Sequence, residues 1–196
     1  LAVSGSGYEP RGELRHGGEL LQPRDDTALQ RLLRAAVLCS DATLEEDADG
    51  AWRVHGDPME GALIAAALKG GLDLDATRRR WPRADLIPFE SSHKFMATLH
   101  REAGGEGQII VKGAPEVVIG MCARAQGADG ERPIDTEHWL QRMEAMAADG
   151  QRILAVAAKP VPAQQADLGF DDVGSELLLL GLFGLMDPPR EESIAA

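Results

Sequence analysis

Apolar residues recur at helical spacing in three parts of the 196-residue chain. Within residues 29–37, 62–68 and 139–146, apolar positions lie three and four residues apart, which is the period of a helix with one buried face. Asp26 precedes the first stretch and Pro58 opens the second, and both residue types are favoured at helix starts. These patterns predict three amphipathic helices, of which the third covers about 135–148.

Shorter apolar runs, bounded by glycine, proline or charged residues, predict the strands. Residues 95–101 and 108–112 flank the glycine-rich segment 104–107, and we expect them to pair as an antiparallel hairpin. Further strands are expected over 2–8, 12–14, 52–55, 85–89, 153–158 and 176–186, further helices over 72–80 and 115–122, and loops over 41–50, 127–130 and 160–174. Hairpin-paired strands with helices between them predict an α+β fold, in which helices flank a mainly antiparallel, twisted β-sheet.

Composition and charge narrow the possible partners. The formal charge of −12 argues against nucleic acid or an anionic membrane surface as a ligand. The longest apolar run, 177–186, is too short for a membrane helix, which needs about 20 residues, and we interpret it as a buried strand. Cys39 and Cys122 have no metal-ligand spacing. Any phosphate ligand would therefore need a local cluster of basic side chains.

The stretch Ile-Ile-Val-Lys-Gly-Ala-Pro-Glu at 109–116 carries the most informative candidate chemistry. A predicted strand ends at Lys112, and Gly113 and Ala114 then turn the chain into a helix that starts at Pro115. The unpaired amides of a helix start can hold an anion, and the lysine would add a full positive charge. The same pattern is also an ordinary connection between a strand and a helix, so this stretch alone does not decide between the two.

Several other features are interpreted as structural. Asp-Leu-Asp-Ala-Thr at 73–77 resembles the motif of phosphoryl-transferring aspartate enzymes, but no apolar strand leads into it. The basic run 78–80 has no aromatic residues between its charges, which favours a solvated helix face. His93 and His100 are expected at the surface and not as ligands. Gly5 and Gly7 lack the third glycine of a dinucleotide-binding loop.

Five motifs in a fixed order give a more specific indication. They are Gly-Asp-Pro-Met-Glu-Gly-Ala-Leu at 56–63, Ile-Pro-Phe-Glu-Ser-Ser-His-Lys-Phe-Met at 87–96, Val-Lys-Gly-Ala-Pro-Glu at 111–116, Asp-Gly-Gln-Arg-Ile-Leu-Ala at 149–155 and Gly-Leu-Met-Asp-Pro-Pro-Arg at 184–190. In this order the chain resembles the nucleotide-binding (N) domain of P-type cation-transporting ATPases, especially calcium pumps and similar bacterial cation pumps. The resemblance covers nearly the whole chain.

The resemblance implies an ATP site between a sheet surface and helix ends. The residues it implies for this site are Glu60, Phe89, Ser91, Lys94, Met96, Lys112, Gly113, Ala114, Arg152 and Leu154. Phe89 would stack on the adenine, a contact worth about 1 to 3 kcal/mol. Lys94 and Lys112 would line the pocket, and Gly113 would allow the nucleotide to approach the backbone.

Several of these roles have alternatives that the sequence leaves open. Glu60 either approaches the adenine amine or, three residues after the potential cap Asp57, completes a capping box. Phe89 could instead be a core residue of a strand, and Met96 is either a pocket wall or core. Lys112 could meet the adenine or the phosphates, with its charge at the rim of the pocket. Arg152 would reach the phosphate or the ribose of the nucleotide, with Leu154 beside it as a pocket wall. Ser91 stands at a position where some relatives carry an arginine.

The resemblance also implies a role within a larger protein. Residues 1–186 would form the nucleotide-binding domain, and 187–196 would begin a hinge toward a separate phosphorylation domain. The Asp-Lys-Thr-Gly-Thr motif of the phosphorylated aspartate is absent from the sequence. We therefore expect the domain to bind ATP, as Mg-ATP in the full-length pump, without hydrolysing it and without catalytic residues or metal ligands of its own.

The expected setting is the cytoplasmic domain of an integral membrane protein. Its expected partners are ATP and the phosphorylation and actuator domains of the parent pump, with no nucleic acid and no direct membrane contact, and the isolated domain is expected to be a monomer. The alternative is an interaction or regulatory module of the same fold that does not bind nucleotide, which the serine at position 91 leaves open. The transported cation is not encoded in this stretch.

Overall fold

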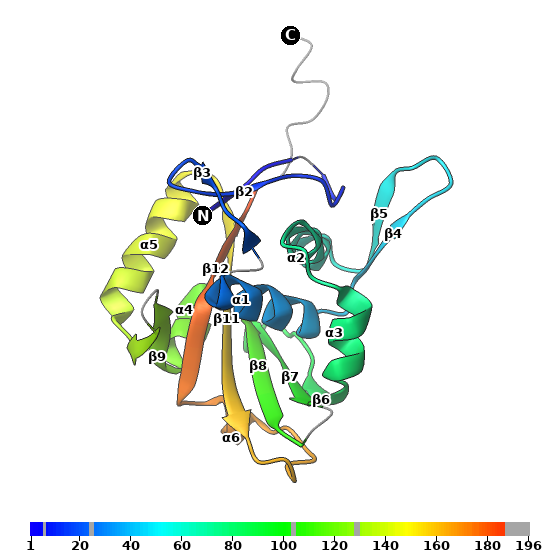
Figure 1. Ribbon diagram of the computed structural model, residues 1–196. Coiled ribbons are helices and arrows are strands. Elements are labelled where there is room, and N and C mark those ends of the chain that lie inside the picture. The colour runs from blue at the N-terminus through cyan, green and yellow to red at the C-terminus, as the bar shows by residue number, and fades with distance from the viewer. Residues whose placement is uncertain (6, 24–25, 103–104, 128–129, 187–196) are drawn as a thin grey trace.

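A seven-stranded sheet is the centre of the computed structural model, which describes residues 1–5, 7–23, 26–102, 105–127 and 130–186 (Figure 1). Its strands are β6 (Arg83–Ile87), β7 (Phe95–Arg101), β8 (Gly107–Gly113), β9 (Cys122–Gly127), β10 (Gly130–Pro133), β11 (Arg152–Val161) and β12 (Leu177–Leu185). Across the sheet they run in the order β10-β9-β12-β11-β8-β7-β6. All neighbours are antiparallel except β12 and β9, which are parallel. The predicted α+β fold with a mainly antiparallel sheet is confirmed.

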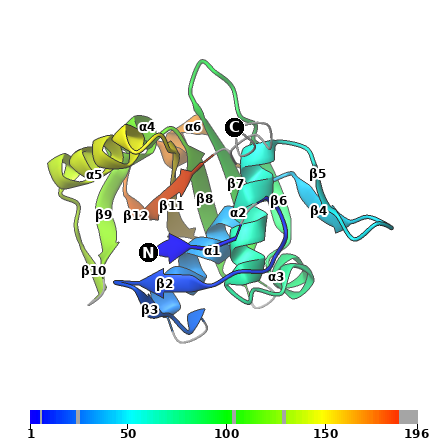
Figure 2. The same cartoon turned by 90° about the horizontal axis from the view of Figure 1, so that it is seen from above.

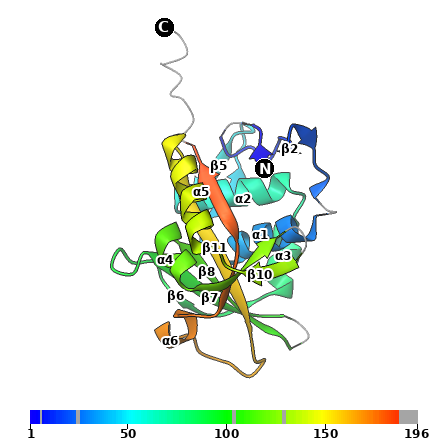
Figure 3. The same ribbon diagram turned by 90° about the vertical axis from the view of Figure 1, so that its left-hand side faces the viewer.

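Helices cover both faces of this sheet, as Figure 3 shows. One face carries α1 (Thr27–Leu38), α2 (Pro58–Lys69) and α3 (Leu74–Arg80), and the other carries α4 (Pro115–Gly120) and α5 (Thr136–Ala148), with the short α6 (Phe170–Val173) before β12. A small sheet of β1 (Ala2–Val3), β2 (Leu14–His16) and β3 (Glu19–Leu20) packs through Leu14 against α1. Among the described residues, none of the helices is long and apolar enough to cross a membrane.

Two apolar layers, one on each face of the sheet, form most of the core, and a third cluster lies between α1, α2 and β2. Phe95, Ala97 and Leu99 of β7 belong to the layer under α4 and α5, whereas Met96 of the same strand belongs to the layer under α1. This alternation follows from the period of two along a strand. Because both faces are covered, the central strands are apolar at successive positions, as the run that forms β12 shows.

Aspartate side chains cap α1, α3 and α5, and the cap at Asp26 of α1 was predicted. Asp26 accepts a hydrogen bond from the Leu29 amide at 2.9 Å, and Asp135 accepts one from the His138 amide at 3.0 Å. Asp73 accepts one from the Ala76 amide at 2.8 Å. The Asp-x-Asp-x-Thr stretch is therefore the start of α3, as its lack of a preceding strand indicated.

Two predicted loops contain regular structure instead, and the strands on either side of the predicted loop 127–130, of which residues 128–129 lie outside the described residues, were missed. The segment 41–50 contains β4 (Thr43–Glu46), which pairs with β5 (Trp52–His55) in a hairpin that projects from the body of the domain (Figure 2). The polar segment before α5 forms the hairpin of β9 and β10, and 160–174 contains the end of β11 and the helix α6. β4 belongs to a two-stranded sheet and β10 lies at the edge of the large sheet, so both lack the apolar alternation by which strands are recognised.

The surface prediction for His100 is wrong. Its side chain is only 2% exposed, because β7 is covered on both faces, and its Nδ1 lies 2.9 Å from the Trp81 carbonyl oxygen. Since a carbonyl only accepts hydrogen bonds, Nδ1 carries the hydrogen. Burial, together with the nearby Arg83 guanidinium, lowers the pKa of His100 to about 4, so the imidazole is neutral at pH 7. The predicted hinge over 187–196 lies outside the described residues.

Candidate functional site

The predicted site residues gather at the end of the sheet where β7 and β11 begin and β8 ends. Gly113 lies opposite Phe95 of β7 on one side and Ala155 of β11 on the other. Lys112 lies opposite Met96 in the next row of the sheet. The start of β11 brings in residues 152–154, and the loop before β7 brings in 88–94. One edge of the central strands therefore collects residues that are far apart in the sequence.

Lys112 forms a buried ion pair at this end of the sheet. Its Nζ donates to Glu60 Oε1 at 2.7 Å and to Ser40 Oγ at 3.0 Å, and only 6% of the lysine side chain and 13% of the glutamate side chain are exposed. Glu60 Oε2 accepts hydrogen bonds from the amides of Asp41 and Ala42 at 2.7 and 2.9 Å. Both charges are therefore compensated by an opposite charge and by further hydrogen bonds, as burial in a low-dielectric interior requires.

This pair changes two sequence predictions. Asp57 caps α2 by accepting hydrogen bonds from the amides of Met59 and Glu60, but the Glu60 carboxylate reaches across to the segment between α1 and β4. The second hydrogen bond of a capping box, from the Asp57 amide to the Glu60 carboxylate, is therefore not formed. Lys112 is also not the exposed rim of an anion site, because its charge is buried against Glu60.

The segment that Glu60 binds is held by arginines as well. Arg83 of β6 donates to the carbonyl oxygens of Leu38 and Ser40, both at 3.1 Å, and also pairs with Asp41. Arg78 of α3 donates to the Ala42 carbonyl at 3.3 Å. These contacts fix the turn that follows α1, and they satisfy carbonyls that the helix end leaves open. The turn in turn fixes the orientation of the Glu60 carboxylate.

Cys39 lies directly beside the ion pair and is fully buried. Burial raises the pKa of its thiol, and the nearby Lys112 charge offsets this only in part. The thiol is therefore protonated, and its Sγ lies 3.7 Å from the carbonyl oxygens of Met96 and Ile110. Since a buried, protonated thiol is a poor nucleophile, Cys39 is a packing residue.

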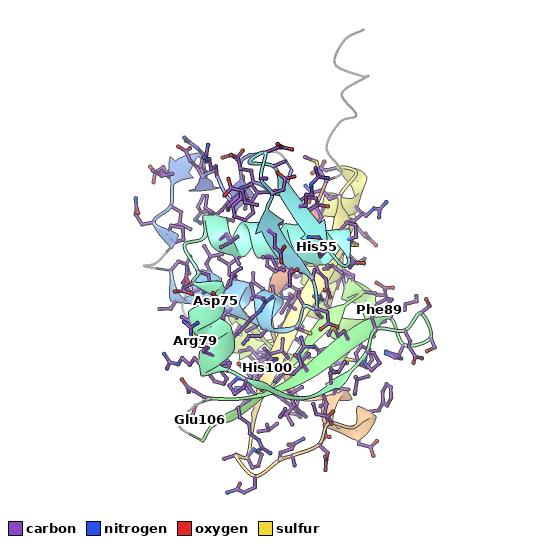
Figure 4. All side chains as sticks on the ribbon, turned by 90° about the vertical axis from the view of Figure 1, so that its right-hand side faces the viewer. His55, Asp75, Arg79, Phe89, His100 and Glu106 are labelled. Atoms are coloured by element: carbon purple, nitrogen blue, oxygen red, sulfur yellow. The ribbon has the colours of Figure 1, made fainter. Side chains whose placement is uncertain are left out.

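The loop of residues 88–94 presents an aromatic ring at the same end of the sheet. Phe89 is 59% exposed, so its alternative role as a core residue is wrong. In Figure 4 Phe89 lies at the opposite end of the sheet from Glu106, with His100 between them. A large aromatic side chain left in solvent, on a loop that packs against the end of β8, is a candidate platform for a planar ligand.

The same loop packs tightly on the turn after β8. The Lys94 carbonyl accepts a hydrogen bond from the Ala114 amide at 2.9 Å, and a Cβ on Gly113 would lie 2.4 Å from that carbonyl oxygen. Only glycine permits this approach. Lys94 itself has a φ of +60°, and its exposed ammonium lies 3.4 Å from the Glu116 carboxylate.

The remaining predicted residues differ in exposure. Met96 is buried in the core under α1, so of its two possible roles the structure supports the core residue and not the pocket wall. Leu154 is half-buried beside the same layer, and Ser91 and Arg152 are exposed. Ala114 is the residue before the first turn of α4. Ser40, which binds Lys112, was not found from the sequence, because no motif surrounds it.

Comparison with known proteins identifies the family of this chain. The family model for the P-type ATPase cytoplasmic domain N matches residues 28–192. The chain therefore belongs to the family of P-type ATPase cytoplasmic N domains, and the resemblance seen in its motifs is confirmed.

Several full-length relatives show the same relationship. The chain is 39% identical to a cation-transporting ATPase of Synechocystis sp. over 99% of its length, and 32% identical to a calcium-transporting ATPase of Bacillus subtilis over 97%. It is 33% identical to a probable cation-transporting ATPase F of Mycobacterium bovis over 100% of its length. In each case it spans 22% of the relative.

Proposed function

We propose that this domain binds ATP at the end of the sheet where β8 ends and β7 and β11 begin. The observation that carries the proposal is the meeting of three parts: the exposed Phe89, the glycine turn at Gly113 against which its loop packs, and the buried pair of Glu60 and Lys112. An exposed ring at the same end of the sheet as hydrogen-bonding groups suits a flat, polar heterocycle such as a purine.

The hydrogen bonds already made leave room for such a base. A lysine ammonium has three N–H donors, of which the described contacts of Lys112 use two. Each carboxylate oxygen can accept two hydrogen bonds, and Glu60 Oε1 receives one from Lys112. Glu60 can therefore accept a hydrogen bond from the adenine amine, and Lys112 can donate one to a ring nitrogen. In this proposal both residues bind the base and neither binds the phosphates.

The phosphates would extend toward the exposed cations. Lys94 and Arg152 lie at the surface of the same end of the sheet, and the contact of Lys94 with Glu116 is an exposed ion pair of 3.4 Å. Exposed pairs of this kind stabilise by about 1 kcal/mol or less, so a phosphate can compete with the glutamate. The overall charge of −12 opposes phosphate binding elsewhere on the surface.

We further propose a positioning role in a full-length pump. The chain spans only 22% of its relatives, so the phosphorylated aspartate would belong to a separate domain. In that setting this domain would hold Mg-ATP and present its γ-phosphate for in-line transfer to the aspartate, in the cytoplasm, beside the phosphorylation and actuator domains. The isolated domain lacks part of the phosphate site in this proposal, so we expect a Kd on the order of 1 mM, about −4 kcal/mol.

Phe89→Ala tests the base-stacking part of the proposal. Loss of the ring should weaken ATP binding about 5- to 150-fold, because stacking on a base contributes about 1 to 3 kcal/mol. The free energy of unfolding should stay within about 0.5 kcal/mol of wild type, since the side chain is exposed. Titration calorimetry and thermal unfolding measure the two quantities, with Leu20→Ala, another exposed apolar side chain, as the matched control. Equal affinity of Phe89→Ala and wild type would disprove the stacking role.

A further inference from the structure

The loop that carries Phe89 is held by a residue that the proposed nucleotide contacts do not include. His93 is half-buried and points back toward the start of its own loop, where its Nε2 lies 3.0 Å from the Pro88 carbonyl oxygen. A carbonyl oxygen only accepts, so Nε2 carries the hydrogen in this contact. The amides of His93 and Lys94 also bond to the Glu90 carbonyl, at 3.3 and 2.7 Å.

The imidazole of His93 is also fixed by two aromatic rings. Its centroid lies 4.6 Å from that of Phe95, the buried first residue of β7, with the ring planes at 61°. On another side it lies 5.2 Å from the ring of Phe170 in α6, at 78°. Edge-to-face contacts in this distance range are favourable. The ring is thereby anchored to the sheet and to a helix that lies far away in the sequence.

The hydrogen bond acts at the peptide unit that determines where Phe89 points. The Pro88 carbonyl belongs to the planar unit that also contains the Phe89 nitrogen, so holding that oxygen fixes the plane from which the Phe89 side chain departs. The pyrrolidine ring of Pro88 also fixes the φ angle of Pro88 itself at about −65°. Both sides of the junction before Phe89 are thereby restricted, although the phenylalanine ring itself is exposed.

We propose that His93 is a positioning residue that orients Phe89 for stacking on the nucleotide base, with Phe170 of α6 holding the imidazole in place. This inference rests on the proposed function. An exposed ring that is already oriented loses less conformational freedom when a ligand binds, which strengthens binding without a new contact to the ligand. His93 thus acts through Phe89 and does not touch the nucleotide.

Two substitutions at this position separate the two features of the imidazole. His93→Phe keeps an aromatic ring against Phe95 and Phe170 but removes the N–H donor, whereas His93→Gln keeps a donor and removes the ring. We expect His93→Phe to weaken ATP binding about threefold to tenfold relative to wild type, which is the range for loss of one hydrogen bond. His93→Gln, which keeps a donor, should weaken ATP binding less than His93→Phe does. His16→Phe, an exposed histidine on β2, is the matched control and should bind ATP as wild type does.

A second background tests whether His93 acts through Phe89. In Phe89→Leu, which has no ring to orient, His93→Phe should have almost no further effect on the Kd for ATP. If His93→Phe weakens ATP equally in both backgrounds, or leaves wild-type affinity unchanged, the inference is overturned while the proposed function stands. If wild-type protein that is folded by circular dichroism binds no ATP, the proposed function fails first, and the inference fails with it.

A measurement on the unmodified protein covers the case in which the variants do not fold. Long-range proton–nitrogen NMR spectra report which imidazole nitrogen of His93 is protonated. The geometry requires a proton on Nε2 at neutral pH, and this proton should persist when ATP is added. A neutral imidazole protonated on Nδ1 alone would overturn the inference, because the Pro88 carbonyl could then accept nothing from it.

Discussion

Lys112→Met should lower the free energy of unfolding by about 3 to 5 kcal/mol, the range observed when one partner of a buried ion pair is removed. The methionine fills much of the lysine's volume, so the loss is electrostatic. It leaves the Glu60 carboxylate buried with its two backbone hydrogen bonds but without its counter-charge, and it leaves Ser40 Oγ without its donor. Urea denaturation monitored by circular dichroism measures the change.

Two further variants make this result specific. Lys94→Met removes a lysine of the same site whose ammonium is exposed, and it should change stability by about 1 kcal/mol or less. The double variant Lys112→Met/Glu60→Gln removes both buried charges, so its loss of stability should be smaller than the sum of the two single losses. If Lys112→Met is no more destabilised than Lys94→Met, the buried pair does not exist in solution.

His100 should make the domain less stable in mild acid. Its pKa is about 4 in the folded protein and near the ordinary 6.5 in the unfolded chain, so the unfolded chain binds the proton first as the pH falls. The stability present above pH 6.5 is therefore lost as the pH approaches 4. A difference of this size corresponds to about 3 kcal/mol, since one pKa unit is about 1.4 kcal/mol.

Histidine NMR signals followed against pH measure this directly. The His100 ring should titrate near pH 4. In urea denaturation at pH 7 and pH 4.5, His100→Gln should lose less stability between the two conditions than wild type. A His100 ring that titrates near 6.5 would contradict the buried, neutral imidazole.

Local signals in the sequence predicted much of the fold. Asp26 and Asp73 cap helices with their own side chains, a contact of three residues' span, and the hairpin of β7 and β8 follows from two apolar runs around a glycine-rich loop. The edge hairpins were missed for the converse reason. β4 and β10 are exposed strands of mixed polarity, and their pairing is set by tertiary context.

The sequence predicted which residues belong to the candidate site, but not how they contact one another. The motifs indicated Glu60 and Lys112, yet their pairing joins residues 52 positions apart, and Ser40 lies 72 positions from the lysine. No local pattern encodes such a contact. The burial of His100 likewise depends on helices covering both faces of β7. Phe89 was identified by its motif, but only the fold shows that its ring is exposed.

Titration of ATP into nitrogen-15-labelled domain, followed through the backbone amides, tests the central claim most directly. We expect the amides of Phe89, Lys112 and Gly113 to shift in a saturable way, with smaller changes at Lys94 and Arg152. The amides of β10 at the far edge of the sheet should stay unchanged, and they serve as the internal control. A folded domain in which Phe89, Lys112 and Gly113 do not move at 10 mM ATP, about ten times the expected Kd, would contradict the account.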